Sequence, residues 1–506
     1  MVNISAQLLA KIDHYTPKLG AKSIGKITAI GDGVVSLAGL SDAMMAEILD
    51  FPGKTQGLVL NLNKHEVGAI ILGDSLHLKE GDDATTTGKI LQIPAGEELI
   101  GRVIDPLGNP LDGKSKPKTK VTMPLEKIAP GVIARAKVSD PVQTGVAAID
   151  AMIPIGRGQR ELIIGDKSTG KSSIAITTVI NQRKQNLICI YVVIGQKTAF
   201  TAQLIATLEQ FKAMEHTVIV AANSADAPAM QYLAPYAGTA IAEHFASEGK
   251  DVLLIFDDLT KHAWAYRELS LLLRRPSGRE AYPGDVFYLH SRLLERAVKL
   301  SKENGGGSIT ALPIIETQAG DLSAYIPTNV ISITDGQIYL ETDLFNAGIR
   351  PAINAGLSVS RVGGDAQIKA MRQVAGKLRL NLAQYRELAA FAQFSSDLDP
   401  VTKSQLDRGA RITEILKQGW DKPANVTDQV AIIWAVTNGS LDKTPLEQVK
   451  EWQEKYLQYL NLEQGKIMDA IAKEKILTDA TIKQLIKVTD RFNASHKDLQ
   501  FKEEEI

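Results

Sequence analysis

The residues best suited to do chemistry form one short glycine-rich segment, residues 165–172, with the sequence GDKSTGKS. It fits the phosphate-loop pattern G-x-x-x-x-G-K-[ST], in which glycines let the backbone approach a phosphate closely. Backbone N–H groups and the positive N-terminus of the following helix then face the phosphate oxygens. We expect Lys171 to neutralise phosphate oxygens and the Ser172 hydroxyl to bind Mg²⁺. The nucleotide-binding residues predicted in this loop are Gly165, Asp166, Lys167, Ser168, Thr169, Gly170, Lys171 and Ser172.

A second chemical feature is a carboxylate at the end of an apolar run. Residues 252–256 read VLLIF and are followed directly by Asp257 and Asp258. A buried strand that ends in an acid can hold a carboxylate near the Mg²⁺ of a bound nucleotide, here through a water molecule. Taken with the loop, this predicts a Mg-nucleotide site in which Ser172 and Asp257 are the metal-binding residues.

Turnover at such a site needs a group that orients or deprotonates the attacking water. The apolar run 188–194 leads into Gln196, at the place where such a group would stand. An amide cannot act as a base, although a glutamine can position water. The residues alone leave hydrolysis open and favour binding without turnover.

These side chains must be positioned by a parallel sheet that is covered on both faces. Between residues 131 and 367, fully apolar runs alternate with helical patterns, which is typical of such a sheet. A helix is expected directly after the loop, over residues 172–180. The apolar runs are residues 162–164, 188–194, 218–220, 252–256 and 309–312.

The rest of the chain predicts a multidomain α/β protein. Residues 24–93 carry short alternating runs with Gly-rich turns, which predict a small antiparallel β-barrel. The nucleotide-binding domain is expected over residues 94–369, of which residues 94–130 are rich in Pro and Gly and are interpreted as a linker. Residues 370–506 predict a C-terminal α-helical domain. Residues 1–23 form an arm whose apolar residues fall four apart, typical of a helix that packs locally or binds a partner.

Composition excludes several classes of protein. The chain has 506 residues and a net charge of −1, which argues against a protein whose main work is to neutralise nucleic-acid phosphates. Its one cysteine, Cys189, lies in an apolar run, so neither an internal disulfide nor a Cys-based zinc site is expected. The eight histidines have no ligand-like spacing, and no apolar stretch reaches the ~18 residues of a membrane-spanning helix.

Several longer strings carry a resemblance that goes well beyond the loop. The chain resembles the α chains of the F-type ATP synthases, members of the ATPase alpha/beta chain family, over nearly its whole length. The strings are residues 154–160 (PIGRGQR), 271–276 (LLLRRP), 278–285 (GREAYPGD), 325–332 (YIPTNVIS) and 356–364 (GLSVSRVGG). The resemblance implies a β-barrel, a central RecA-like phosphate-loop domain and a helical end.

The resemblance also implies roles for single residues. Catalytic chains of the family carry a glutamate where Gln196 stands, so the site of this chain is expected to hold ATP or ADP with Mg²⁺ without rapid turnover. Arg361 matches the family's arginine finger, which reaches into the catalytic site of the neighbouring β chain. Ser332 and Ser358 match positions near that shared site. Arg350, Pro351 and Gln418 match positions that line the adenine pocket.

The implied partners are β chains in an alternating α3β3 ring, a central-stalk γ chain, and peripheral-stalk δ- or b-type chains at the N-terminal arm. Nucleic acid is not an expected partner. The resemblance places the chain peripherally on the cytoplasmic face of a bacterial plasma membrane, with membrane contact only through the complex. The Met1 start favours this over an organellar matrix or stroma.

Several positions depart from the family pattern. Lys167, Ser168 and Ser172 replace arginine, glutamine and threonine of the usual loop, and Trp420 stands where a polar residue often contacts the base. These changes indicate a divergent site whose grip on nucleotide is altered. One alternative is a self-sufficient homohexameric motor, either a secretion-type ATPase or an RNA translocase, but such a motor is expected to carry a carboxylate in place of Gln196. Another alternative is a structural spacer in the ring, which the retained Lys171, Ser172 and Asp257 argue against.

Overall fold

The computed structural model describes residues 22–376, 378–392 and 399–501, so the expected N-terminal arm and the acidic C-terminal end lie outside the described residues. The described chain divides into two compact units. One unit contains the residues up to Leu91 together with the short segment Leu272–Arg274. The other contains the remaining residues, and every residue of the predicted nucleotide site belongs to it.

The first unit is built on a closed antiparallel barrel with strand order β1-β2-β5-β4-β3-β6. Its strands bury alternate apolar side chains such as Val35, Leu37, Leu49 and Val59 inside the barrel. This confirms the barrel that the short alternating runs predict. The strands are β1 (Ile24–Gly31), β2 (Val34–Ala38), β3 (Glu47–Asp50), β4 (Gln56–Leu62), β5 (Val67–Leu72) and β6 (Asp83–Ile90).

The second unit is organised around an eight-stranded sheet with strand order β18-β17-β12-β16-β15-β13-β14-β8. Its pairs are parallel except for β17 with β18. The five apolar runs of the sequence all lie on its strands. The strands of the large sheet are β8 (Val103–Ile104), β12 (Leu162–Asp166), β13 (Leu187–Gln196), β14 (Thr217–Asn223), β15 (Asp251–Asp257), β16 (Ser308–Thr317), β17 (Gly336–Leu340) and β18 (Val359–Ser360).

The Pro- and Gly-rich segment 94–130 is more structured than a linker. It contributes β8 to the edge of the large sheet, where Val103 and Ile104 pair with β14. It also contains β9 (Val121–Pro124), which pairs with β7 (Gln92–Ala95) in a separate two-stranded sheet. These strands have only two and four residues, too few for a periodic signal in the sequence. A further small sheet pairs β10 (Pro141–Val142) with β11 (Ile155–Gly156).

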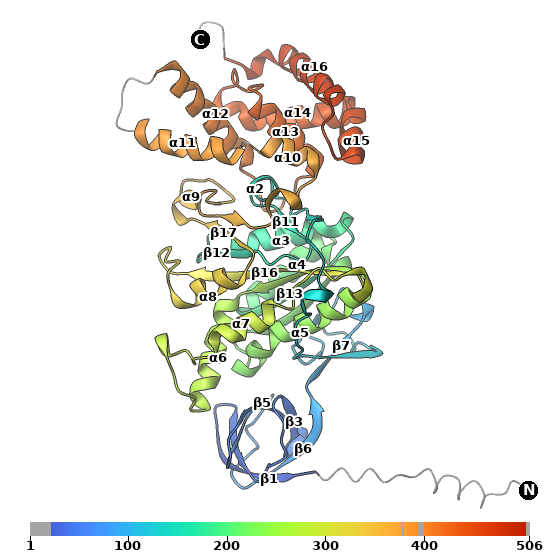
Figure 1. Ribbon diagram of the computed structural model, residues 1–506, viewed down its shortest axis with the longest axis vertical. Helices are drawn as coiled ribbons and strands as arrows, with labels where there is room; N and C mark the ends of the chain where they lie inside the picture. Colours follow the sequence, from blue (N-terminus) through green and yellow to red (C-terminus); the bar gives the residue numbers. More distant parts are fainter. Residues whose placement is uncertain (1–21, 377, 393–398, 502–506) are drawn as a thin grey trace, which may run out of the picture. The chain divides into compact units, whose positions relative to one another are not determined.

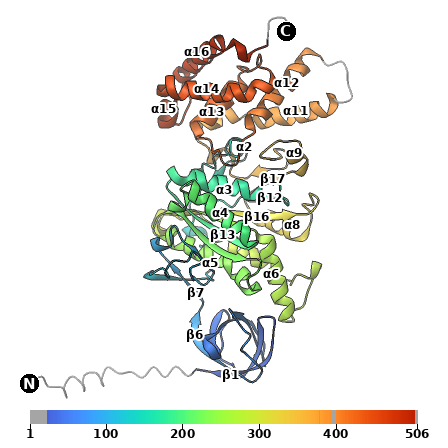
Figure 2. The same ribbon diagram turned by 180° about the vertical axis from the view of Figure 1, so that it is seen from behind.

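Helices cover both faces of the large sheet, as Figures 1 and 2 show from opposite sides. Side chains such as Cys189 and Tyr191 of β13 belong to one apolar core together with residues of α3 and α4. Their neighbours Ile190 and Val192 point the other way, where Gly238 of α5 approaches them closely. The helices are α2 (Ala147–Met152), α3 (Lys171–Asn181), α4 (Thr198–Gln210), α5 (Pro228–Ser247), α6 (Leu259–Leu272), α7 (Val286–Leu294), α8 (Tyr325–Ile333) and α9 (Thr342–Asn346).

The chain beyond the sheet is helical, as the sequence predicts, and its helices form one bundle (Figure 2). Trp452, Tyr456 and Phe492 form its aromatic centre, with the Trp452 and Tyr456 rings stacked at 4.6 Å. The bundle is joined to the α/β part by Gln429, whose Nε2 donates to the buried Asp150 carboxylate at 2.8 Å. The helices are α10 (Lys369–Ala375), α11 (Leu378–Ala392), α12 (Pro400–Leu416), α13 (Val426–Thr437), α14 (Val449–Glu463), α15 (Gly465–Glu474) and α16 (Asp479–Ser495).

Candidate functional site

The glycine-rich loop joins the end of β12 to the start of α3, as its pattern predicts. Gly165 has the neighbouring strand so close that a β-carbon there would lie 2.5 Å from the Leu340 carbonyl oxygen. Gly170 has φ 99°, a left-handed conformation that glycine adopts without strain. The first hydrogen bond of α3 joins the Ile174 amide to the Gly170 carbonyl at 3.1 Å. The amides before Ile174 therefore lie at the open N-terminus of the helix, where an anion is favoured.

Lys171 is buried at the base of this loop. Its ammonium group donates to the backbone carbonyl of Asp166 at 2.5 Å, which bends the lysine back across the loop. Burial lowers the pKa of Lys171, while the nearby carboxylates, Glu316 first among them, raise it. The ammonium group thus lies beside the loop with acidic groups around it, a position from which it can neutralise phosphate oxygens.

The Asp166 side chain holds the loop in place. Its Oδ1 accepts hydrogen bonds from Thr317 Oγ1 at 2.6 Å and from the Gly320 amide at 2.9 Å, and its Oδ2 accepts from Thr342 Oγ1 at 3.0 Å. Burial opposes ionisation, but these three donors lower the pKa of Asp166 below its ordinary value. The carboxylate therefore links the loop to the ends of β16 and β17. Lys167 and Ser168 are exposed at the crest of the loop.

Ser172 and Asp257 are adjacent, as a shared metal ion requires. The Ser172 hydroxyl hydrogen-bonds the Asp257 carboxylate, which is 1 % exposed. Tyr191 donates its phenolic hydrogen to Asp257 Oδ2 at 2.7 Å, and Gln196 donates from Nε2 to Asp257 Oδ1 at 2.7 Å. Burial and then the charge of Asp258 raise the pKa of Asp257. A hydroxyl next to a carboxylate is a hard oxygen donor set that suits Mg²⁺.

Gln196 lies at the end of β13, beside both acids. Its amide also contacts Asp258 Oδ2 at 3.3 Å, and the Lys261 ammonium group binds the same oxygen. The Gln196 nitrogen is thus occupied by carboxylates. Its oxygen can accept a hydrogen bond from water but cannot take a proton.

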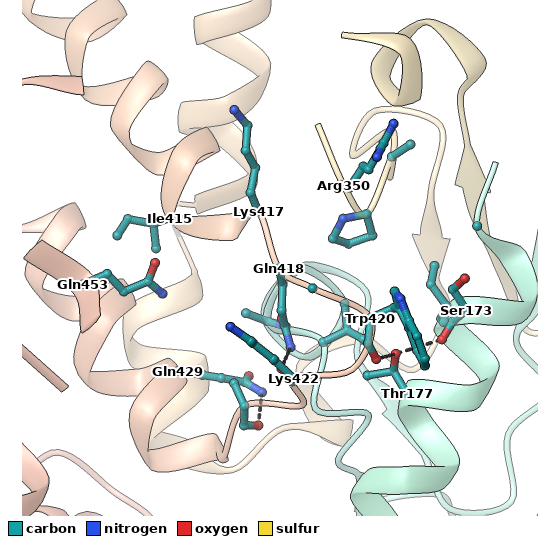
Figure 3. Close-up of a pocket in the computed structure, with 18 of the residues that line it drawn as sticks. Ser173, Thr177, Arg350, Ile415, Lys417, Gln418, Trp420, Lys422, Gln429 and Gln453 are labelled. Carbon is teal, nitrogen blue, oxygen red and sulfur yellow. Dashed lines mark hydrogen bonds between the residues drawn. The ribbon is translucent and has the colours of Figure 1, made fainter. Parts of the chain in front are cut away.

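Arg350, Pro351 and Gln418 line one cavity of about 740 Å³, which opens beside the loop and reaches the helical bundle. The Arg350 guanidinium lies over the Phe345 ring, 4.2 Å from its centroid. Gln418 is bonded to the backbone around it: Nε2 donates to the carbonyls of Gly145 at 2.6 Å and Lys422 at 2.7 Å. Trp420, singled out in the sequence, lines the same cavity (Figure 3).

Arg361 lies at the far end of the sheet from the loop. It follows β18, and its backbone amide donates to the Asp335 carbonyl at 2.9 Å, just before β17 begins. Gly165 pairs instead with Leu340, the last residue of β17. A strand of this length spans about 13 Å, so Arg361 and the loop of the same chain are held apart. The Arg361 side chain is exposed.

The two predicted serines differ in accessibility. Ser332 is exposed and donates its hydroxyl hydrogen to the Asn329 carbonyl at 2.6 Å. Ser358 is fully buried, and its Oγ accepts a hydrogen bond from the Tyr339 amide at 2.9 Å. Ser358 therefore fixes the segment that leads to Arg361, whereas Ser332 lies at the surface.

Three side chains around the loop were missed by sequence reasoning, namely Tyr191, Lys261 and Glu316, and Asp258 was noted only as the neighbour of Asp257. Glu316 lies near the end of β16 and acts electrostatically on both Lys171 and Lys261. Its signal in the sequence is the same as that of Asp257, an acid that closes an apolar run. Tyr191 gave no signal, because a tyrosine inside an apolar strand is usually only a packing residue.

Comparison with known proteins gives family matches along most of the chain. Residues 21–88 match the ATP synthase alpha/beta family, beta-barrel domain. Residues 145–360 match the nucleotide-binding domain of that family, and residues 367–492 match the ATP synthase alpha/beta chain, C terminal domain. Together the three models cover well over half of the 506 residues.

Similar full-length proteins are also found. A protein of Dehalococcoides mccartyi described as ATP synthase subunit alpha is 58 % identical over 483 residues, which is 95 % of this chain and 96 % of the relative. A protein of Syntrophomonas wolfei with the same description is 57 % identical over 494 residues, which is 97 % of this chain and 98 % of the relative.

Proposed function

We propose that this chain, which belongs to the ATP synthase alpha/beta family, is the non-catalytic, nucleotide-binding α subunit of a rotary ATP synthase. In this role it binds ATP or ADP with Mg²⁺ and contributes Arg361 to the catalytic site of a neighbouring β chain. The observation that carries the proposal is the position of Gln196, whose amide contacts Asp257 at 2.7 Å beside the loop. The names of the relatives agree with it.

Phosphate binding is assigned to the loop. The amides at the N-terminus of α3 and the Lys171 ammonium group would bind the phosphate oxygens, while Ser172 and Asp257 would hold Mg²⁺. The metal ion, when bound, offsets the negative charge of the phosphates. Asp166 acts by fixing the loop, since its oxygens are taken up by Thr317, Gly320 and Thr342.

The absence of turnover follows from chemistry at Gln196. Hydrolysis requires a group that takes a proton from water or orients it strictly in line. The Gln196 amide does not take a proton, and its nitrogen is held by Asp257 and Asp258. Glu316, a further acid near the loop, interacts with the charges of Lys171 and Lys261. ATP bound at this site is therefore not rapidly hydrolysed.

The partner role is assigned to the face that carries Arg361. Its side chain is exposed, and the sheet keeps it at the opposite end of β17 from the loop. An exposed guanidinium that is held away from the phosphates of its own chain can serve a site on another chain. We place the chain in a ring with β chains around a γ shaft, with peripheral-stalk chains at the N-terminal arm.

The placement at a membrane is indirect. None of the helices in the described ranges combines the length and the apolar character that crossing a bilayer requires. We propose that the chain is held at the cytoplasmic face of a bacterial membrane through the other subunits of the complex.

Binding and hydrolysis measured on the purified full-length chain test this function. Equilibrium dialysis is expected to find one Mg-ATP per chain, with phosphate release no faster than the uncatalysed background. Lys171→Ala should weaken binding about 10- to 100-fold, because it removes charge-assisted hydrogen bonds. Lys184→Ala, on the exposed turn that follows α3, should bind as the unmodified chain does.

Two results would overturn the assignment. Brisk hydrolysis by the chain alone would identify a self-sufficient homohexameric motor. Failure to bind Mg-ATP at all would identify a structural spacer of the ring.

A further inference from the structure

Gln418 has the polar side chain best suited to recognise a base, but its amide already makes hydrogen bonds within the protein. An amide can both donate and accept, which is what reading the edge of adenine or guanine requires. The Gln418 nitrogen donates to the Gly145 and Lys422 carbonyls, and the Gln418 oxygen accepts from the Ala147 amide at 3.1 Å. Its backbone amide donates to the Arg350 carbonyl at 2.8 Å. Gln418 thus holds the cavity wall together.

Trp420 lies two residues further along the same wall. Its backbone carbonyl accepts a hydrogen bond from Thr177 Oγ1 at 2.5 Å, which fixes the segment that carries Trp420 against helix α3. Its side chain is 46 % exposed, although it lines the cavity beside the phosphate-binding loop. Figure 3 shows the indole next to Ser173 and Thr177, on the same side of Gln418 as Arg350. A large aromatic face is therefore open to the cavity near the loop.

We propose that Trp420 determines the base specificity of this site by stacking its indole on the nucleobase. This inference rests on the proposed nucleotide site and deepens it. Stacking becomes more favourable as the area of the stacked ring increases. It does not depend strongly on the identity of the base, since every base has a π face. The site therefore binds purine nucleotides and does not distinguish ATP from GTP, while pyrimidine nucleotides bind more weakly.

The neighbouring side chains agree with this tolerance. Arg350 has only N–H donors, and its guanidinium is held over the Phe345 ring. Guanine presents an O6 acceptor where adenine presents an N6 donor, so the N–H donors of Arg350 do not reject guanine. An amide that was free to read adenine would reject guanine, but the Gln418 amide is already hydrogen-bonded within the protein.

Tryptophan emission gives a direct readout on the full-length chain. The chain has four tryptophans, of which Trp434 and Trp452 are buried and Trp264 and Trp420 are 41 % and 46 % exposed. Mg-ATP and Mg-GTP should quench emission in the unmodified chain and in Trp264→Phe, which is the matched control. The quenching should be absent in Trp420→Phe, whose binding is followed by dialysis instead.

The affinities complete the test. The Kd values for Mg-ATP and Mg-GTP should agree within about threefold, and Mg-UTP should bind more weakly. Trp420→Leu should raise both purine Kd values about tenfold, whereas Trp420→Phe, which keeps an aromatic ring, should lose much less. A more than tenfold preference for ATP over GTP would overturn the proposal, as would quenching that persists in Trp420→Phe. Absence of any Mg-ATP binding would instead overturn the nucleotide site itself, which separates the two failures.

Discussion

The Asp257 carboxylate is the residue to which we assign the metal dependence of nucleotide binding. It is buried, adjacent to the Ser172 hydroxyl, and held by Tyr191 at 2.7 Å and Gln196 at 2.7 Å. Asp257→Asn removes the charge while nearly preserving the shape of the side chain. We expect the gain in ATP affinity on adding Mg²⁺ to disappear in this variant, with metal-free ATP bound as before.

Tyr191→Phe is the matched control for that measurement. It removes one hydrogen bond to the same carboxylate and leaves the charge in place. Dialysis with and without Mg²⁺ should show that Tyr191→Phe keeps most of the metal effect. Equal metal dependence in Asp257→Asn and in the unmodified chain would show that the ion is held elsewhere.

At the scale of elements, the loop depends on how closely β12 approaches β17. A β-carbon at position 165 would lie 2.5 Å from the Leu340 carbonyl oxygen and 3.1 Å from Thr169 Oγ1. Gly165→Ala must therefore separate β12 from β17 or move the loop, and overpacking of this kind costs about 1–3 kcal/mol. We expect a lower midpoint of thermal unfolding together with weaker Mg-ATP binding.

Gly284→Ala offers a control in the same unit, because a β-carbon at Gly284 meets nothing within 4 Å. It should unfold and bind nucleotide like the unmodified chain. Identical midpoints and affinities for Gly165→Ala and Gly284→Ala would mean that the close approach is not needed.

The elements also show how far the sequence could predict this molecule. Strand β15, its terminal Asp257 and the loop before α3 were all predicted, because apolar runs and glycine spacing are local signals. Strand β8 was not, because two residues paired at a sheet edge have no periodicity. The occupied amide of Gln418 was not either, because its partners Gly145 and Ala147 are more than 270 positions away in the sequence.

At the scale of the whole molecule, stability is expected to fall in mild acid. His262 and His290 are fully buried among Tyr232 and Tyr236, with their rings 5.4 Å apart. Burial lowers the pKa of His290 to about 4, and burial lowers the pKa of His262 as well. Between about pH 6.5 and pH 4 the unfolded chain binds more protons than the folded one, so the free energy of unfolding decreases as the pH falls. Each such histidine contributes about 1.4 kcal/mol per pH unit in that range.

His290→Leu separates this contribution from other effects of acid. Within the described residues, neither ring nitrogen of His290 has a hydrogen-bond partner, so the substitution removes a titrating group without breaking a bond. Calorimetry at pH 7 and pH 5 should show a smaller loss of thermal stability for His290→Leu than for the unmodified chain. His65→Gln, at an exposed site in the barrel, should not change the loss. An unchanged loss in His290→Leu would exclude this histidine as a cause.

Assembly is the other property of the whole molecule. The exposed Arg361 side chain and the phosphate-binding loop lie at opposite ends of β17, so the role proposed for Arg361 concerns a site on another chain. In the proposed ring, this separation would let a chain with Gln196 at its own site contribute to catalysis on a neighbouring chain.

Turnover of the reconstituted complex carrying Arg361→Ala tests this division of labour most directly. An arginine finger stabilises the charge of the transition state, so ATP hydrolysis at saturating ATP should fall by ~10³- to 10⁵-fold. Nucleotide binding at the neighbouring chain and at the Trp420 cavity should persist, and Arg361→Lys should recover only part of the rate. Turnover at the level of the unmodified complex in Arg361→Ala would contradict the account.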